Sequence, residues 1–188
     1  MEHFYQNIGE DWFSYPQLYK RIVDNSQDGS HIVEVGSWKG RSAAFMAVEI
    51  INSNKKIKFD CVDTWEGTKG EHDTEMSVIN GTLFDEFLNN IKPLTDNGLT
   101  INVIKSKSQE CDARFSDDFF DFIYIDGSHY YEDVKQDIIK YLPKLKKTGT
   151  FAGHDWQSED IRKAVGETLG LQNIKTVHNT WIYQPTKN

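Results

Sequence analysis

The chain has 188 residues, of which 38% are apolar, 21 are basic and 29 are acidic. This length suits one domain with a hydrophobic core, so we expect a single domain over residues 1–188. The formal charge of −8 argues against a nucleic-acid-binding surface, because neutralising phosphates requires clustered Lys and Arg.

The sequence also argues against a membrane partner. Its longest uncharged apolar stretch, residues 43–48, is far shorter than the roughly 20 residues that span a bilayer. The first residues lack the basic start of a secretory signal, and Cys61 and Cys111 have no metal-site or disulfide-motif spacing. We therefore expect a cytoplasmic protein with reduced, buried thiols.

Residues 1–30 mix aromatic and polar side chains, and Leu18, Ile22 and Val23 recur at helical spacing. This pattern predicts an N-terminal helical cover that lies over a sheet edge or over a ligand. A role in contacting substrate or in forming a homo-oligomer stays open.

The most informative stretch is residues 31–42. A β-branched run over residues 32–35 stops at Gly36, and apolar residues recur at helical spacing over residues 43–51, which predicts a strand, a tight turn and a helix. Gly36 and Gly40 allow positive φ angles and a close approach of the backbone to a ligand. The N–H groups at the start of the helix favour an anionic group there.

Spacing separates the nucleotide-binding motifs that this turn could represent. A P-loop needs four residues between its glycines and then Lys, whereas three residues separate Gly36 from Gly40 and Arg41 follows. A dinucleotide fingerprint needs a glycine where Trp38 stands. The pattern that remains is acidic-x-Gly-x-x-x-Gly, from Glu34 to Gly40.

The next predicted strand, residues 57–62, ends on Asp63. Doubly wound folds place the acid that binds ribose hydroxyls at this position, although an ordinary turn cap is the alternative. Trp65 is expected either to stack near an adenosine or to plug the sheet edge. Residues 64–81 are polar and longer than the usual two to six residues of such a loop, so we interpret them as a lid-like insertion. Its His72 is expected in a solvated charged loop and not in a metal site.

A helix that begins at Leu83 is expected to end at Pro93, and a strand over residues 99–104 leads to Ser108. The nearly continuous apolar run 119–125 predicts a central parallel strand that is buried on both faces. Its carboxyl end carries Asp126 and His129 towards the ligand crevice. The last predicted elements are a helix over 131–142, a strand over 150–153 that delivers Asp155, a helix over 158–169 and a hairpin over 174–183.

Four ordered motifs together resemble those of class I S-adenosylmethionine-dependent methyltransferases, in the small domains grouped with sugar and macrolide O-methyltransferases. The motifs are Glu34-Val-Gly-Ser-Trp-Lys-Gly-Arg-Ser42, Val62-Asp-Thr-Trp-Glu-Gly67, Ile125-Asp-Gly-Ser-His-Tyr130 and Gly153-His-Asp-Trp156. The resemblance covers about residues 30–156. It implies an α/β fold with a Rossmann-like, doubly wound, seven-stranded sheet of order 3-2-1-4-5-7-6, mostly parallel with an antiparallel last strand.

The resemblance also implies S-adenosylmethionine as cofactor, with Asp63 on the ribose, the glycine turn around the methionine portion and Asp126 near the methionine amino group or a metal. Lys107 departs from the pattern, because related proteins often carry an acid there, which leaves Gln109 or a backbone carbonyl to contact the adenine. The cofactor-binding residues it implies are Glu34, Gly36, Ser37, Trp38, Gly40, Ser42, Asp63, Thr64, Trp65, Ser108 and Asp126.

The implied reaction is an in-line methyl transfer, and a hydroxyl acceptor must also lose a proton. His129 is the first candidate for the base, since an unperturbed imidazole titrates near pH 6.5; the alternative is a structural histidine. We expect Asp126 and Asp155 to assist it. A divalent cation such as Mg²⁺ on Asp126 and Asp155 is the alternative activator, but Trp156 stands where a second acid would complete an oxygen-rich site, so His154 or His129 would have to complete a different one.

The resemblance implies O-methylation of a sugar-like or other small-molecule hydroxyl. Two alternatives stay open. The acid-x-x-His element at Asp126 and His129 also occurs in a hydroxylase that resembles the same family, and a non-catalytic cofactor-binding module would carry the same turn.

Overall fold

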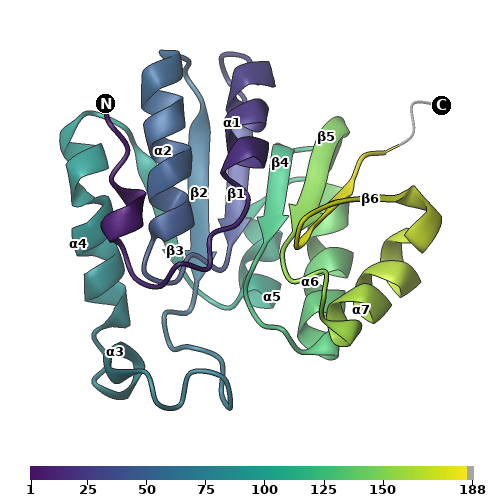
Figure 1. Ribbon diagram of the computed structural model, residues 1–188. Coiled ribbons are helices and arrows are strands. Elements are labelled where there is room, and N and C mark those ends of the chain that lie inside the picture. The colour runs from purple at the N-terminus through teal and green to yellow at the C-terminus, as the bar shows by residue number, and fades with distance from the viewer. Residues whose placement is uncertain (186–188) are drawn as a thin grey trace.

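The computed structural model describes residues 1–185, and its centre is one seven-stranded sheet of order β3-β2-β1-β4-β5-β7-β6 (Figure 1). The pairs from β3 through β5 are parallel, and β7 runs antiparallel to both β5 and β6. This is the predicted strand order. The strands are β1 (His31–Val35), β2 (Lys58–Asp63), β3 (Ile101–Lys105), β4 (Phe120–Ile125), β5 (Leu145–Gly153), β6 (Ile174–Val177) and β7 (Thr180–Tyr183).

Helices cover both faces of the sheet (Figure 1). One face carries α1 (Pro16–Asn25), α2 (Arg41–Ser53) and α4 (Leu83–Asp96). The other face carries α5 (Ser108–Cys111), α6 (Tyr131–Tyr141) and α7 (Glu159–Leu169). Among residues 1–185, no helix combines the length and the apolar character needed to cross a bilayer.

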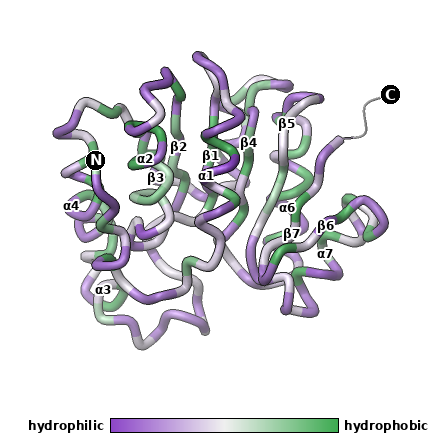
Figure 2. The backbone as a smooth tube through the Cα atoms, turned by 45° about the horizontal axis from the view of Figure 1, so that its top comes forward, coloured by the Kyte–Doolittle hydropathy of each residue, from purple (hydrophilic) through white to green (hydrophobic). Residues whose placement is uncertain are grey.

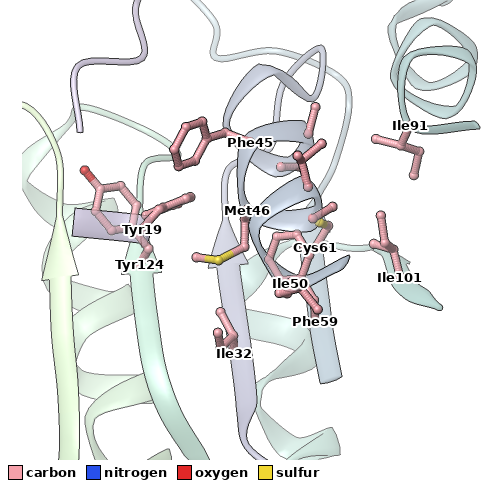
Figure 3. Close-up of a cluster of buried hydrophobic side chains, with 14 of the residues drawn as sticks. Tyr19, Ile32, Phe45, Met46, Ile50, Phe59, Cys61, Ile91, Ile101 and Tyr124 are labelled. Carbon is pink, nitrogen blue, oxygen red and sulfur yellow. The ribbon is translucent and has the colours of Figure 1, made fainter. Parts of the chain in front are cut away.

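Alternating strand residues fill two separate hydrophobic clusters, one on each face of the sheet. Ile32 and Phe122 belong to the cluster beneath α1, α2 and α4, part of which Figure 3 shows. Val33 and Ile123 belong to the cluster beneath α6 and α7. Because successive side chains of a strand point to opposite faces, a strand covered on both sides must be apolar throughout. This explains the unbroken apolar runs in the sequence.

Residues 1–15 form no α-helix, so the predicted N-terminal helical cover is confined to α1. This helix begins at Pro16, whose fixed φ suits the first helical position and whose missing N–H has no partner to lose there. The preceding residues contain one short 3-10 turn (Tyr5–Asn7) and cross the carboxyl ends of the strands (Figure 1). They are therefore placed to contribute to a site at that edge.

Residues 64–81 lead from β2 to α4 and contain only the one-turn helix α3 (Met76–Ile79). Figure 1 shows this segment projecting beyond the edge of the sheet at the carboxyl ends of the strands, and Figure 2 shows that it is mostly hydrophilic. The lid-like role expected for these residues stays a prediction.

The prediction that Pro93 ends the helix from Leu83 is wrong, since α4 continues through Pro93 to Asp96. The extra turn buries Leu94 completely in the cluster beneath α2. Asn97 Nδ2 also donates a hydrogen bond of 2.7 Å to the Pro93 carbonyl. Burial of one leucine side chain, worth about 2 kcal/mol, offsets most of the penalty of proline inside a helix.

Candidate functional site

A cavity of about 930 Å³ lies at the carboxyl ends of strands β1 to β5. Its walls are the loops after these strands, the N-terminal segment and the insertion, and its volume falls in the range of small-molecule sites. Doubly wound sheets bind their ligands in this crevice. The predicted site residues that line it are Gly36, Ser37, Trp38, Ser42, Asp63, Thr64, Ser108, Asp126, His129 and Asp155.

The glycine turn after β1 packs directly against the turn after β4. Gly36 has a φ of +89°, and a Cβ added to it would lie 2.1 Å from the carbonyl oxygen of Asp126. Gly40 has a φ of +91° and forms the N-cap of α2. Both positions therefore require glycine, the first because of a close backbone approach as well as its φ.

Asp63 joins the loops after β1 and β2. Its Oδ2 accepts backbone hydrogen bonds from Ser37 at 2.8 Å and from Trp38 at 2.9 Å, while Oδ1 accepts one from Trp65 at 2.8 Å. A carboxylate offers about four lone-pair positions, so capacity remains for a hydroxyl of a ligand in the cavity. The carboxylate thus both holds the turn and faces the crevice.

Three predicted cofactor residues, Glu34, Gly40 and Trp65, do not line the cavity. Glu34 is buried under the turn, accepts hydrogen bonds from Tyr19 and Ser37, and has its pKa raised to about 7 by burial. It supports the turn from below. Trp65 is a buried member of the hydrophobic cluster. Its indole N–H donates a hydrogen bond of 2.9 Å to the Trp38 carbonyl. Of the two roles predicted for Trp65, the structure favours filling the edge of the sheet over stacking on an adenosine.

His129 lies between two carboxylates, with Nε2 2.8 Å from Asp155 Oδ2 and Nδ1 3.1 Å from Glu71 Oε2. The hydrogen bond to Asp155 raises the pKa of His129 to about 9. In this arrangement the imidazole is a cation at neutral pH. This pKa is above the unperturbed value of about 6.5 from which His129 was considered as a base, because the fold brings Asp155 after β5 and Glu71 of the insertion to the same ring.

Asp126, His154 and Asp155 form a second group, in which one ligand atom from each lies within 4.8 Å of the others. His154 Nδ1 is 3.3 Å from Asp155 Oδ1 and 3.6 Å from Asp126 Oδ1. Burial raises the pKa of Asp126. Burial would also raise the pKa of Asp155, but its hydrogen bonds to His129 and His154 outweigh this and lower it.

Two consecutive residues of the N-terminal segment hold this group in place. Ser14 Oγ and His154 Nε2 share a hydrogen bond of 2.7 Å, and the Tyr15 hydroxyl donates to Asp126 Oδ2 at 2.6 Å. The Tyr15 ring also stacks on Tyr124 of β4 with a centroid distance of 4.2 Å. The sequence analysis missed both residues, since no local pattern links positions 14 and 15 to the ends of β4 and β5.

Lys39 connects the two segments that cover the cavity. Its Nζ lies 2.8 Å from Glu10 of the N-terminal segment and 3.1 Å from Glu75 of the insertion. Beside it, the Trp38 ring packs on His72 at a centroid distance of 4.3 Å. His72 thus forms part of an aromatic wall, and burial lowers its pKa.

The loop after β3 meets α6 at the opposite end of the cavity. Ser108 and Gln109 donate side-chain hydrogen bonds to Asp137, which lines the cavity although only 3% of it is exposed. Lys107 also lines the cavity, but its side chain is largely exposed, and its Nζ lies 3.9 Å from Glu110 Oε1. Asp137 was also missed, because a polar residue in an amphipathic helix normally faces solvent.

Comparison with solved structures supports the methyltransferase fold. The O-methyltransferase NovP has 15% sequence identity and a TM-score of 0.70, over 92% of this chain and 79% of NovP. CalS11, a TDP-rhamnose 3'-O-methyltransferase of calicheamicin biosynthesis, has 14% identity and a TM-score of 0.61, over 89% of this chain and 75% of CalS11. An rRNA methylase from Streptococcus thermophilus has 13% identity and a TM-score of 0.59, over 93% and 99% of the two chains.

At these identities the structures establish a shared fold and no more. A search of curated proteins gives no match. The family model described as "Methyltransferase domain" matches residues 33–156, which include the glycine turn, Asp63, Asp126, His129 and Asp155. Since this match spans more than half of the chain and the strand order agrees with it, the chain belongs to the class I S-adenosylmethionine-dependent methyltransferase family.

Proposed function

We propose that the protein transfers the methyl group of S-adenosylmethionine to a hydroxyl of a small, sugar-like acceptor. The observation that carries this proposal is the polar cluster of His129, Asp155 and Asp126 beside the Gly36 turn, because proton removal from a hydroxyl requires such groups next to the methyl donor. The activities of NovP and CalS11, both O-methyltransferases, agree with it.

The cavity residues fit this cofactor. The remaining lone pairs of Asp63 suit the ribose hydroxyls, and the N-terminus of α2 with Ser42 suits the methionine carboxylate. Asp126, a carboxylate that lines the same cavity, would suit the methionine amino group. When bound, the cofactor supplies an electrophilic methyl on a sulfonium sulfur. The protein's own contribution is to hold the acceptor oxygen about 3 Å from that methyl and in line with it.

His129 and Asp155 are assigned to proton removal. Asp155 orients the imidazole, and His129 accepts the proton only in its neutral form. Because the pKa of His129 is raised to about 9, the rate of methyl transfer should increase with pH up to about that value. Replacing Asp155 by Asn removes the largest cause of the raised pKa, so the rise should move to lower pH.

A divalent cation on Asp126, His154 and Asp155 is a second candidate for activating the acceptor, favoured by the closeness of their ligand atoms. When bound, it would polarise the acceptor oxygen. His154 Nε2 is hydrogen-bonded to Ser14, which leaves Nδ1 to bind the cation. One nitrogen among the ligands suits a first-row ion such as Mn²⁺ better than Mg²⁺. Loss of turnover in EDTA with recovery on Mn²⁺ supports the cation, and full activity in EDTA excludes it.

The test of the cofactor is thermal unfolding with S-adenosylmethionine, S-adenosylhomocysteine, NAD and ATP. A ligand at 100 times its dissociation constant adds about 2.7 kcal/mol, which is roughly 5 to 11 °C for a domain of this size. The shift should occur with the two adenosyl ligands alone, shrink in Asp63→Asn and persist in the exposed control Glu66→Gln. A shift with NAD or ATP instead would overturn the proposal.

The acceptor class has its own test. Methyl-labelled cofactor is incubated with a thymidine diphosphate sugar or with catechol, and label is measured in the recovered acceptor. Label in either supports hydroxyl methylation. Oxygen-dependent turnover without label transfer would favour the hydroxylase-like alternative.

A further inference from the structure

Three aromatic rings from distant parts of the chain meet at one side of the cavity. Trp12 comes from the N-terminal segment, Trp38 from the turn after β1 and His72 from the insertion, and all three line the cavity. The ring centroids of Trp38 and His72 are 4.3 Å apart, and that of Trp12 lies 6.1 Å from Trp38 and 6.2 Å from His72. These three residues are the aromatic wall.

Trp12 leaves much of its ring uncovered, since 56% of the residue is exposed. Trp65 and Trp181, in contrast, are almost completely buried. Removing an indole face from water is strongly favourable, so an exposed indole that lines a cavity marks a surface on which a ligand can pack. The cofactor contacts proposed above use neither Trp12 nor His72.

The wall lies beside the groups assigned to the reaction. The backbone N–H of Trp38 donates a hydrogen bond of 2.9 Å to Asp63, the proposed ribose ligand. Glu71, which precedes His72 in the chain, lies 3.1 Å from His129. A molecule that packs on the wall is therefore close both to the cofactor position and to the proposed base. This is the place that the acceptor must take.

His72 contributes an uncharged ring. Its Nδ1 accepts a hydrogen bond of 3.0 Å from the backbone N–H of Thr68, so this nitrogen carries no proton. Burial also lowers the pKa of His72. The wall therefore presents neutral rings, and the faces of its indoles carry the negative part of the ring quadrupole, which attracts cations.

Carboxylates outnumber cations around the wall. Lys39 Nζ lies 5.7 Å from the centroid of the Trp38 ring. The carboxylates of Glu10, Glu75 and Glu86 lie 2.8, 3.1 and 4.0 Å from this nitrogen. The hydrogen bond from Lys39 lowers the pKa of Glu75, which is therefore ionised at neutral pH. One cation thus faces several negative charges.

The other cations on this side of the cavity do not reverse the balance. His129 is paired with two carboxylates and Arg41 with one. Lys69 is exposed, so water and salt screen its charge. An anionic group on the wall would be repelled by the surrounding carboxylates, whereas an ammonium group would be attracted both by them and by the indole faces.

We propose that the acceptor carries a protonated amino group and that the aromatic wall binds this group by cation–π contact, with Trp12 as the outer ring. The inference rests on the proposed function, since the acceptor hydroxyl is the group that is methylated. A protonated amine has no lone pair with which to attack the methyl carbon, and its role is to position the hydroxyl near His129. Two classes of molecule carry this chemistry, amino sugars and hydroxylated arylalkylamines.

The experiment is calorimetry at pH 6.5 on the protein saturated with S-adenosylhomocysteine. Dopamine is compared with 4-ethylcatechol, which lacks only the amino group, and glucosamine is compared with glucose. The wild-type protein should bind at least one amine about 5- to 30-fold more tightly than its neutral partner, the range of a partly desolvated cation–π contact. A preference in the first pair assigns an arylalkylamine, and one in the second pair assigns an amino sugar.

Variants of Trp12 test whether the wall is responsible. Trp12→Leu removes the outer ring at an exposed position, so the protein should fold and the preference should fall to about twofold or less. Trp12→Phe keeps a weaker ring face and should retain part of the preference. Met76→Ala is the matched control, because Met76 is an exposed apolar residue of the insertion outside the cavity lining. An unchanged preference in Trp12→Leu overturns the inference.

The wild-type protein separates the failure of this inference from that of the proposed function. If S-adenosylhomocysteine binds and neither amine is preferred, the inference is overturned and the proposed cofactor stands. If S-adenosylhomocysteine does not bind, the proposed function fails and the inference fails with it. Weaker binding of S-adenosylmethionine, but not of S-adenosylhomocysteine, to Trp12→Leu would assign the wall to the cofactor sulfonium and would also overturn the inference.

Discussion

The two halves of the cavity are built in different ways. The half around β1 and β2 relies on backbone groups: Gly36 allows a close approach, and Asp63 accepts three backbone hydrogen bonds. The half around β4 and β5 relies on ionisable side chains that hold one another, chiefly His129, Asp155 and His154. Backbone geometry responds little to pH, whereas paired side chains respond strongly. Substitutions that alter the backbone should therefore disturb the first half most, and changes in protonation should disturb the second.

Gly36→Ala should have the largest effect on stability. It tests whether the backbone shape of the first half is essential. The new Cβ would lie 2.1 Å from a backbone oxygen and the φ of +89° would stay strained, so the free energy of unfolding should fall by about 3 to 5 kcal/mol. Urea denaturation measures the loss.

Gly29→Ala is the matched control for this substitution. Gly29 has a similar φ of +86°, but nothing lies within 4 Å of an added Cβ. Its cost should be about 1 to 2 kcal/mol, from backbone strain alone. Equal losses at both positions would show that the close approach at Gly36 is unimportant.

The second prediction concerns pH and the ionisable half. The folded pKa of His129, about 9, lies above the unfolded value of about 6.5. Its stabilising effect is therefore complete below about pH 6.5 and is lost as the pH rises through about 9. Allowing for a side chain that is 38% exposed, we expect a loss of about 1 to 2 kcal/mol over this range.

Urea denaturation in EDTA at pH 6, 7.5 and 9 measures this loss. His129→Gln should remove the step between pH 7.5 and 9, above the pKa of about 7 to which burial raises Glu34 and Asp137, while His178→Gln, in the turn between β6 and β7, should retain it. If the free energy of unfolding of the wild-type protein did not change with pH, the His129 ion pairs would not stabilise the fold.

Tyr15→Phe tests the hydrogen bond by which the N-terminal segment holds Asp126 in the ionisable half. The ring keeps its stacking on Tyr124, but the partly buried Asp126 carboxylate loses a donor, so the expected loss is about 1 to 2 kcal/mol. Thermal unfolding measures it. Tyr5→Phe is the control, because no hydrogen bond of the Tyr5 hydroxyl is found in residues 1–185, and it should be near neutral.

Lys39→Met should have the smallest effect on global stability, about 1 kcal/mol or less, since Glu10 and Glu75 are exposed enough to be hydrated by water. Its local effect should be larger. Hydrogen exchange of residues 4–15 and 64–81 should accelerate, because the side chain joining them is gone. Lys92→Met, which removes only an exposed pair with Asp96, should leave this exchange unchanged. Equal protection in both variants would contradict the link.

Most of the fold and half of the cavity could be predicted from the sequence, because they depend on local patterns. The strands follow from apolar runs, their order follows from the resemblance to class I methyltransferases, and the proposed cofactor residues Gly36, Ser37 and Asp63 lie in local strand-turn motifs. Contacts between distant segments leave no such pattern. Tyr15 and Asp137 are separated from their partners by 111 and 29 residues. The raised pKa of His129 likewise depends first on Asp155 and then on Glu71, which only the tertiary structure brings to the ring.

The contacts of Ser14 and Tyr15 also have a consequence for how the protein is made. They join the start of the chain to Asp126 and His154, residues that leave the ribosome more than a hundred positions later. The half around β1 and β2 is complete once the turn after β4 has packed on Gly36, whereas the ionisable half must also wait for β5. A nascent chain can therefore be largely folded and still inert. The groups proposed to remove the proton are then the last part of the cavity to assemble, and a product truncated before β5 would lack them.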